Sequence, residues 1–576
     1  MPGGARKALA AFAGGALMVS SAWAGAALVP VGDDEIVDRT RETVSNAGPQ
    51  QQPQSQPQPQ RQTSAPAAGE QSGRSVPSGA SLPDGRVLAG AAKTSIKPRP
   101  ADYGGTWETD GSKCSRLSAD AFTSFFDDPA EFGDHLASTG SPWPENPNCI
   151  YMGGFGIGPA NPVTSWDEDL GLWVRALALR DRTGDDLVLV VLDGEGWFWD
   201  YANKCADCGA KQIADQLAGD AALGLKAEDV VIAATHSHAA PDFIGGWGFV
   251  PDWYMKQVTD TIKSTVGDAM RSMRPAVLEY GERNARSFNN ERRETYRSAE
   301  EQQLAWLRAY VPAQKSGTQR RRGRRAPAKK QPTTIATLGA YAAHPTTHGT
   351  NDGEAHPDWP GLFEKSLEER FGGIGLHFMT GLGNMSASGL KERAEDLAGL
   401  VADIGDGNRV DEPDVRTARS TWKQPVTNAP LSALGVPGFF DRQFVQEPAN
   451  VQTGENPDKF QCSSTSPVAA EVAASAARIG DELALTAAPG EVFSNFSNTL
   501  KEQSGSTITF PLAQANDALG YMPQSFELSP AGQQGLGFAE PVQGYVVVNY
   551  EDAYAIDRCF GDMALETSIG LLNGLR

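Results

Sequence analysis

The sequence has no excess of basic residues, no internal repeat and, beyond its first 24 residues, no apolar stretch long enough to span a membrane. It holds 50 Lys and Arg against 71 Asp and Glu, so its formal net charge is −21. That charge argues against nucleic acid as the main partner and favours solubility. Only seven of the 576 residues are histidine and six are cysteine, so the positions of these residues are informative.

The cysteines lack the spacing of a complete zinc knuckle. Cys205-Ala-Asp-Cys208 could be half of a knuckle or a redox pair, but no second CxxC exists, and a local disulfide is favoured. An even number of cysteines in an exported protein predicts disulfides, with fifteen connectivities open from sequence alone. The six residues are Cys114, Cys149, Cys205, Cys208, Cys462 and Cys559.

The N-terminal part of the chain is predicted to be an export signal followed by a tether. Met1–Ala24 has basic Arg6 and Lys7, an apolar stretch and an A-x-A cleavage site, although without cleavage it would be an anchor. Residues 25–86 are predicted to be a disordered tether, because the stretch from Asn46 to Ser81 is rich in Gln, Pro, Ser and Gly. One large folded domain is expected over residues 87–576, in a secreted or envelope-associated protein.

A basic segment interrupts the acidic chain. Lys315–Lys330 holds eight Lys or Arg and no acidic residue, and it separates the apolar runs Gln303–Val311 and Thr333–Ala343. We interpret residues 315–332 as a solvated loop insertion in a hairpin; the alternative is contact with an anionic membrane or envelope surface.

Strand and helix patterns alternate along the folded part, which predicts an α/β (mixed α+β) fold with helices packed on mixed sheets. Strands are expected at Gly90–Ile96 and in a hairpin formed by Trp173–Arg180 and Asp186–Leu192. The expected helices are Ala210–Leu217, Tyr254–Met273, Pro360–Arg370, Pro467–Glu482, Val492–Glu502 and Met563–Leu575.

Four further strand-like runs end next to residues that can do chemistry. Ligands gather outside the carboxyl ends of strands in sheets built from strand–helix units, so we expect these residues to converge at an active site. Two imidazole-bearing segments, a serine and a carboxylate suit a zinc hydrolase. The runs are Asp229–Thr235 before His236 and His238, Thr333–Ala343 before His344, Ile374–Met379 before Ser386, and Glu482–Ala488 before Glu491.

Each of these residues also has an ordinary structural explanation. His236 and His238 can share one face of an extended strand end, but an isolated HxH pair is weak evidence for a metal. Ser386 could be a helix N-cap and Glu491 a first-turn glutamate. The histidines strengthen the metal interpretation, because five of the seven fall in two short segments, as His236, His238, His344, His348 and His356.

Five motifs in this order resemble the catalytic domain of neutral/alkaline non-lysosomal ceramidases, zinc amidases that cleave the N-acyl bond of ceramide. The similarity extends from about Leu88 to Arg576 and includes Tyr151-Met-Gly-Gly-Phe155 and Asn549-Tyr-Glu-Asp-Ala553. The motifs are Thr235-His-Ser-His-Ala-Ala-Pro241, Ala343-His-Pro-Thr346, Gly383-Asn-Met-Ser386, Pro489-Gly-Glu491 and Asn516–Met522.

The resemblance implies roles for particular residues. It makes His236, His344, Glu491 and Tyr521 the zinc ligands. It places His238 beside the metal or at the substrate carbonyl, and Ser386 at the position of a nucleophile. Gly153, Tyr550 and one arginine would bind substrate, and we select Arg292 over Arg286 and Arg293.

The sequence therefore predicts an exported zinc amidase acting on ceramide or a related N-acyl lipid, with no dedicated protein partner. Two alternatives stay open: an esterase or amidase of the same fold acting on another envelope lipid, and a tethered, non-catalytic protein that binds lipid or cell wall. The segment after His344 departs from the family pattern, as do the insertions near Cys114 and Cys205, and the immunoglobulin-like C-terminal domain of longer members is expected to be missing.

Overall fold

The computed structural model describes most of the predicted folded domain. The predicted export signal, most of the tether and all but the last two residues of the basic insertion lie outside the described residues. No helix in the described part is long and apolar enough to cross a bilayer. The described residues are 75–78, 82–114, 146–154, 161–201, 204–246, 249–293, 298–313, 331–350, 352–428, 431–432, 435–436, 440–442, 444–454, 461–529, 540–542, 545–547 and 550–576.

Alternating apolar side chains in the middle of the chain build a nine-stranded mixed sheet. Only the pairs β4–β5 and β9–β11 are parallel within it. A short strand, β13 (Asn408–Arg409), pairs with β6 off the main order. The main order is β11 (Ile374–Met379), β9 (Thr333–Tyr341), β8 (Gln303–Val311), β6 (Arg274–Asn284), β1 (Val87–Ser95), β3 (Trp173–Arg180), β4 (Asp186–Leu192) and β5 (Val230–Ala234).

The two faces of this sheet bury two different cores. In β3, Leu177 and Leu179 join an inner core that also receives Leu338 of β9 and Leu485 of the second sheet. The alternate residues of β3, among them Ala176, point to an outer core shared with the helices. Because successive side chains of a strand point to opposite faces, one face of this sheet packs against the second sheet and the other face packs against helices.

A second, four-stranded sheet corrects one prediction. Its order is β14 (Val415–Pro425), β17 (Ala469–Ile479), β18 (Leu483–Ala487) and β20 (Ile508–Leu512). The helix expected over Pro467–Glu482 is wrong, because this segment forms β17 between β14 and β18. Its alanines favour helix by intrinsic propensity, but burial between two partner strands outweighs that weak preference.

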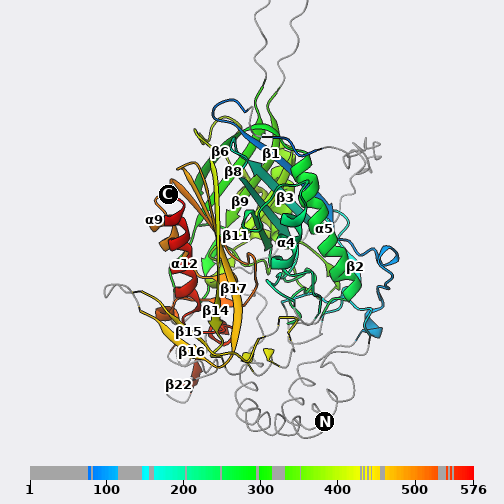
Figure 1. Cartoon of the computed structure of the whole chain (residues 1–576). Helices are drawn as coiled ribbons and strands as arrows, with labels where there is room; N and C mark the ends of the chain where they lie inside the picture. The colour runs from blue at the N-terminus through cyan, green and yellow to red at the C-terminus, as the bar shows by residue number, and fades with distance from the viewer. Residues whose placement is uncertain are drawn as a thin grey trace, which may run out of the picture.

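Helices cover the outer faces of both sheets. In Figure 1, α5 and α12 lie on opposite sides of the strands. The long helix α5 packs on β1 and β3, α6 packs on β11, and α12 packs on β14 and β17. The mixed α/β fold class and the single large domain are therefore confirmed. The helices are α4 (Ala210–Gly219), α5 (Asp252–Arg271), α6 (Asp358–Phe371), α7 (Leu390–Gly399), α9 (Ser494–Gln503), α11 (Tyr550–Ala553) and α12 (Phe560–Gly574).

Short two-stranded ladders join the loops between these layers. The ladders are β2 (Ser165–Trp166) with β10 (Glu354–Ala355), β7 (Asn289–Glu291) with β12 (Met385–Ala387), β15 (Ala449–Gln452) with β16 (Ser463–Ser466), β19 (Glu491–Val492) with β21 (Tyr521–Met522), and β22 (Glu540–Val542) with β23 (Tyr545–Val547).

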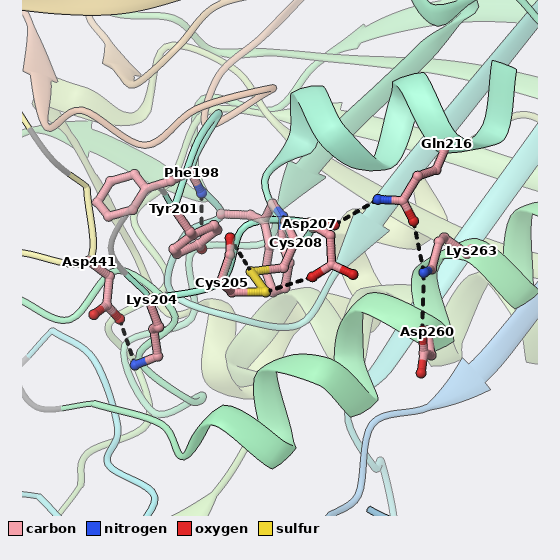
Figure 2. The surroundings of a disulfide bond; sticks show 11 residues. Phe198, Tyr201, Lys204, Cys205, Asp207, Cys208, Gln216, Asp260, Lys263 and Asp441 are labelled. Carbon is pink, nitrogen blue, oxygen red and sulfur yellow. Dashed lines mark hydrogen bonds and ion pairs between the residues drawn. A yellow bond between two sulfur atoms is a disulfide. The ribbon is translucent and has the colours of Figure 1, made fainter. Parts of the chain in front are cut away.

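All six cysteines form disulfides, as the sequence predicted. The pairs are Cys114–Cys149, Cys205–Cys208 and Cys462–Cys559. Figure 2 shows the local Cys205–Cys208 bridge before α4, where Gln216 Nε2 donates to the Asp207 carbonyl at 3.0 Å. The same glutamine accepts a hydrogen bond from Lys263 of α5 at 3.1 Å, so the bridged loop is tied to two helices.

Candidate metal centre

The two histidines after β5 turn toward the same point through a left-handed residue. His236 has φ of 60°, a conformation that costs a non-glycine residue energy and is held only by its surroundings. The expectation of an extended strand end is therefore wrong at His236. The two rings still meet, since the Nε2 atoms of His236 and His238 lie 3.4 Å apart.

Backbone hydrogen bonds bring the end of β9 to the same place. The His238 amide donates to the Pro345 carbonyl at 3.2 Å, and the His344 amide donates to the Met385 carbonyl at 2.9 Å. His344 also forms an isolated bridge with Ser386 of β12. The histidine segments and the serine segment are thus joined directly through main chain.

A two-residue parallel ladder supplies the remaining oxygen donors. Glu491 of β19 is the register partner of Tyr521 in β21, and its amide donates to the Gly520 carbonyl at 2.8 Å. Both side chains are buried. Residues 30 positions apart in the sequence are therefore held beside each other by main-chain pairing, independently of what their side chains bind.

The converging side-chain atoms lie within a few ångströms of one another. Glu491 Oε2 is 3.5 Å from His236 Nε2 and 3.5 Å from His344 Nε2. The Tyr521 hydroxyl is also 3.5 Å from His344 Nε2. One nitrogen from each of His236, His238 and His344 lies within 4.8 Å of the other two. All four predicted ligands and His238 thus surround one point.

The Nδ1 hydrogen bonds of the three imidazoles turn each Nε2 atom toward the centre. Each Nδ1 donates to a main-chain carbonyl: His236 to Glu195 at 2.6 Å, His238 to Gly154 at 2.9 Å and His344 to Leu382 at 3.2 Å. A neutral imidazole that donates through Nδ1 presents a lone pair at Nε2, which is how metal-binding histidines are oriented.

An unsatisfied oxygen shows that the donor set fits a cation. Glu491 Oε2 is buried and has no hydrogen-bond donor among the described residues. A buried carboxylate oxygen without a donor is costly unless a cation neutralises it. Two imidazole nitrogens, a carboxylate and a phenol oxygen are donors that zinc accepts.

The pKa values of the histidines differ because their neighbours differ. Burial lowers the pKa of His236, but the Glu491 and Glu195 carboxyl groups outweigh it and raise that pKa to about 9. Burial, with the positive charges of His236 and Arg292, holds the pKa values of His238 and His344 well below the ordinary range. These directions make His236 the group that carries positive charge beside Glu491, at 3.5 Å and without a hydrogen bond, whereas His238 and His344 are neutral. A bound cation would replace the His236 proton as the partner of Glu491.

Of the three candidate arginines, Arg292 reaches this centre. Its Nη2 donates to the Tyr521 hydroxyl oxygen and to the Gly383 carbonyl, each at 3.0 Å, and its Nε pairs with Glu551 at 3.1 Å. Arg293 instead donates to the Glu527 carbonyl and to Asp552. Arg292 therefore holds the phenol oxygen of Tyr521 in place.

Ser386 is not a helix cap. It lies in β12, is half-buried, and pairs with Asn290 of β7. Helix α7 begins later, at Leu390, and its N-cap residue is Gly389. The ordinary explanation for this serine is removed, and its backbone lies beside His344.

Sequence reasoning missed Glu195, which packs against His236. Its Oε1 lies 3.6 Å from His236 Nδ1, its Oε2 has no partner among the described residues, and burial raises its pKa to about 8. Glu195 follows β4, so the rule that ligands gather at strand ends would have found it. Gly153 lies against this carboxylic acid, where a Cβ would meet Glu195 Cγ at 2.4 Å.

The backbone of Gly154 lies against the His238 ring, as that of Gly153 lies against Glu195. Gly154 has φ of 96°, and a Cβ on it would meet His238 Cγ at 2.2 Å.

The predicted substrate residue Tyr550 begins α11, the helix that carries the Arg292 partner Glu551. The side chain of Tyr550 lies outside the described residues.

No protein-family model and no curated protein sequence matches the chain. Solved structures do match, among them the neutral ceramidase from Pseudomonas aeruginosa and a ceramidase complexed with C2. In each case the TM-score is 0.54 at 14% sequence identity, over 86% of this chain and 75% of the other. The similarity expected from the motifs is thus present in the backbone, and the chain has the fold of neutral ceramidase.

Proposed function

We propose that this protein is an exported zinc-dependent amidase that hydrolyses the N-acyl bond of ceramide or a related N-acyl lipid. The observation that carries the proposal is the Glu491 carboxylate oxygen, buried without a donor and 3.5 Å from two imidazole nitrogens. The shared fold with a neutral ceramidase supports the reaction class.

His236, His344, Glu491 and Tyr521 would hold the zinc ion. When bound, zinc supplies Lewis acidity, which polarises an amide carbonyl and lowers the pKa of water. Arg292 donates to the Tyr521 oxygen at 3.0 Å, which fixes the direction of the phenol.

His238 is suited to move the proton. Its Nδ1 is held by the Gly154 carbonyl at 2.9 Å, and its low pKa keeps Nε2 unprotonated. Nε2 would accept the proton of the attacking hydroxyl group, from water or from Ser386, and return it to the nitrogen of the departing amine.

The basic insertion is separate from this chemistry. Val311 and Thr333, the residues that flank it, are register partners at the start of β9, whereas His344 follows the other end of that strand. Nine residues of strand span about 30 Å. We therefore assign the insertion no catalytic role, and contact with an anionic surface would be independent of the metal centre.

Metal content and substrate range test the proposal together. His344→Ala should remove one zinc per chain and abolish release of fatty acid from N-acyl sphingosine, while His377→Leu, at a buried histidine outside the centre, should keep both. Unchanged zinc in His344→Ala would contradict the ligand set. Cleavage of simple esters or N-acyl amino acids with none of ceramide would assign another substrate to the same centre.

Ser386→Ala tests the nucleophile. Because Ser386 caps no helix, its removal should leave the melting temperature and zinc content unchanged. If Ser386 attacks the carbonyl, kcat should fall by orders of magnitude. Full activity in the variant would leave water as the nucleophile.

A further inference from the structure

We propose a second site for a borderline divalent cation of the zinc class, formed by His348, Asp352 and Glu354. These residues lie on the segment between His344 and α6, the part of the chain that departs from the ceramidase motifs. One ligand atom from each lies within 4.8 Å of the other two, and His348 Nε2 is 3.7 Å from Asp352 Oδ2.

Apart from one main-chain contact, in which Asp352 Oδ1 accepts the Glu354 amide hydrogen at 3.1 Å, the three donors have no competing partner among the described residues. His348 Nε2 is buried and makes no hydrogen bond to the described residues. Among the described residues, no donor forms a hydrogen bond with the Glu354 carboxylate. No described Lys or Arg forms an ion pair with Asp352, with Glu354 or with the neighbouring Asp167. His348 Nε2, Asp352 and Glu354 therefore face one another without a Lys or Arg partner among the described residues.

His356 belongs to the surroundings of the site and is not a ligand. Its Nδ1 accepts the Asp358 amide hydrogen at 2.8 Å, so the ring proton is on Nε2, which faces Asp167 at 3.1 Å. The His356 ring stacks on His348 with centroids 3.8 Å apart and planes 3° apart. The stack fixes the plane of the His348 ring and so the direction of its Nε2 atom.

Main-chain contacts hold the ligand segment in position. The His348 amide and the Thr347 hydroxyl donate to the two carboxylate oxygens of Asp358 at 2.7 and 2.6 Å. Gly353, between the two acidic ligands, accepts the amide hydrogens of Thr164 and Ser165 at 2.8 and 3.1 Å. Both ends of the ligand set are therefore anchored, as a preformed metal site requires.

The donor types select the ion. Calcium and magnesium prefer all-oxygen sites, whereas an imidazole with two carboxylates suits zinc and similar ions. Tetrahedral zinc with bonds of about 2.0–2.1 Å needs ligand atoms about 3.3 Å apart. The 3.7 Å between His348 Nε2 and Asp352 Oδ2 is close to this spacing, and a small movement of the Asp352 side chain, which is 59% exposed, would shorten it. Water would complete the coordination.

The second site adjoins the segment that carries the first. The His356 amide donates to the Ala239 carbonyl at 3.0 Å, and the Ser237 hydroxyl donates to the His356 carbonyl at 2.8 Å. A cation that closes the 348–354 segment would stiffen the chain packed on the His236–His238 turn. The expected consequence is stability of that turn, without a part in the chemical step.

Zinc counting on purified full-length protein, dialysed against a weak chelator, tests the proposal. We expect two zinc ions per chain, one in Glu354→Gln, one in His348→Ala, one in His344→Ala, and none when Glu354→Gln and His344→Ala are combined. His377→Leu is the matched control and should keep two. Added zinc should raise the melting temperature of metal-stripped His344→Ala only while Glu354 is intact.

The outcomes separate this site from the catalytic one. An unchanged zinc count in soluble Glu354→Gln overturns the second site, and so does a single zinc that His344→Ala removes entirely. If the proposed catalytic centre is wrong, His344→Ala keeps its zinc, yet Glu354→Gln still loses one. Glu354→Gln, a nearly isosteric change in a half-buried side chain, decides the matter if His348→Ala does not fold.

Discussion

Three main-chain carbonyls set the direction of the buried imidazoles at the candidate metal centre. Each accepts from an Nδ1 atom, so the inward nitrogen is determined by backbone that no side-chain substitution removes. Gly154 is the most constrained of the three carbonyl-bearing residues. Its φ of 96° and its close approach to the His238 ring leave no room for a side chain.

Gly154→Ala should therefore damage activity more than stability alone explains. The matched control is Gly184→Ala, because Gly184 has φ of 98° but no atom within 4 Å of its Cβ position. Both variants should lose roughly 1 kcal/mol of stability from the left-handed backbone. Only Gly154→Ala should lower kcat, by tenfold or more, as the His238 ring is displaced. Equal activity in the two variants would show that the ring position is unimportant.

At the scale of elements, β11 buries a histidine that the reaction does not use. The His377 ring lies with its centroid 4.6 Å from Trp359 and 5.5 Å from Phe363 of α6, and neither ring nitrogen has a hydrogen bond to the described residues. The His377 amide donates to the Glu364 carboxyl group at 3.0 Å. Burial lowers the pKa of His377 to about 3.

This histidine should make the fold sensitive to acid. Its folded pKa lies below the unfolded value of about 6.5, so its contribution to stability is present above pH 6.5 and is lost as the pH falls toward 3. His377→Leu should raise the free energy of unfolding at pH 7.5 by about 1 kcal/mol, since a buried unsatisfied group is removed. The advantage should grow by about 1.4 kcal/mol for each pH unit below 6.5. Denaturant midpoints at pH 7.5 and 5.5 measure it, and an advantage that does not change with pH would contradict the assignment.

Sequence patterns predicted a helix or strand well where the hydrophobic period and the length of the apolar run agreed. They failed where pairing with distant strands determined the structure. The run Ile374–Met379 is β11 as expected, because a short apolar run between turn signals has few alternatives. The segment that forms β17 is rich in alanine, which favours helix, and no local pattern reports its pairing with β14 and β18. The contact of Arg292 with Tyr521 lies between residues 229 positions apart, and no local pattern reports it.

At the scale of the whole molecule, the long-range disulfide should matter more than the local one. Cys462–Cys559 joins the start of β16 to the start of α12 across 97 residues, whereas Cys205–Cys208 closes only three. Closing a long loop removes more entropy from the unfolded chain.

Cys462→Ser with Cys559→Ser should therefore lower the free energy of unfolding by about 2–5 kcal/mol. The same double change at Cys205 and Cys208 is the control and should cost clearly less. Thermal melts of both double variants and of the unsubstituted protein with its disulfides intact give the comparison. Similar losses would mean that local packing, not chain entropy, dominates.

The candidate metal centre draws its atoms from segments that reach from Gly154 to Glu551. Of these parts, Tyr521 and the Arg292 partner Glu551 come last along the sequence. During synthesis, which proceeds from the N-terminus, the set of converging side chains is therefore complete only after Tyr521 has been made. A nascent chain stalled before Tyr521 would hold folded strands but an incomplete centre.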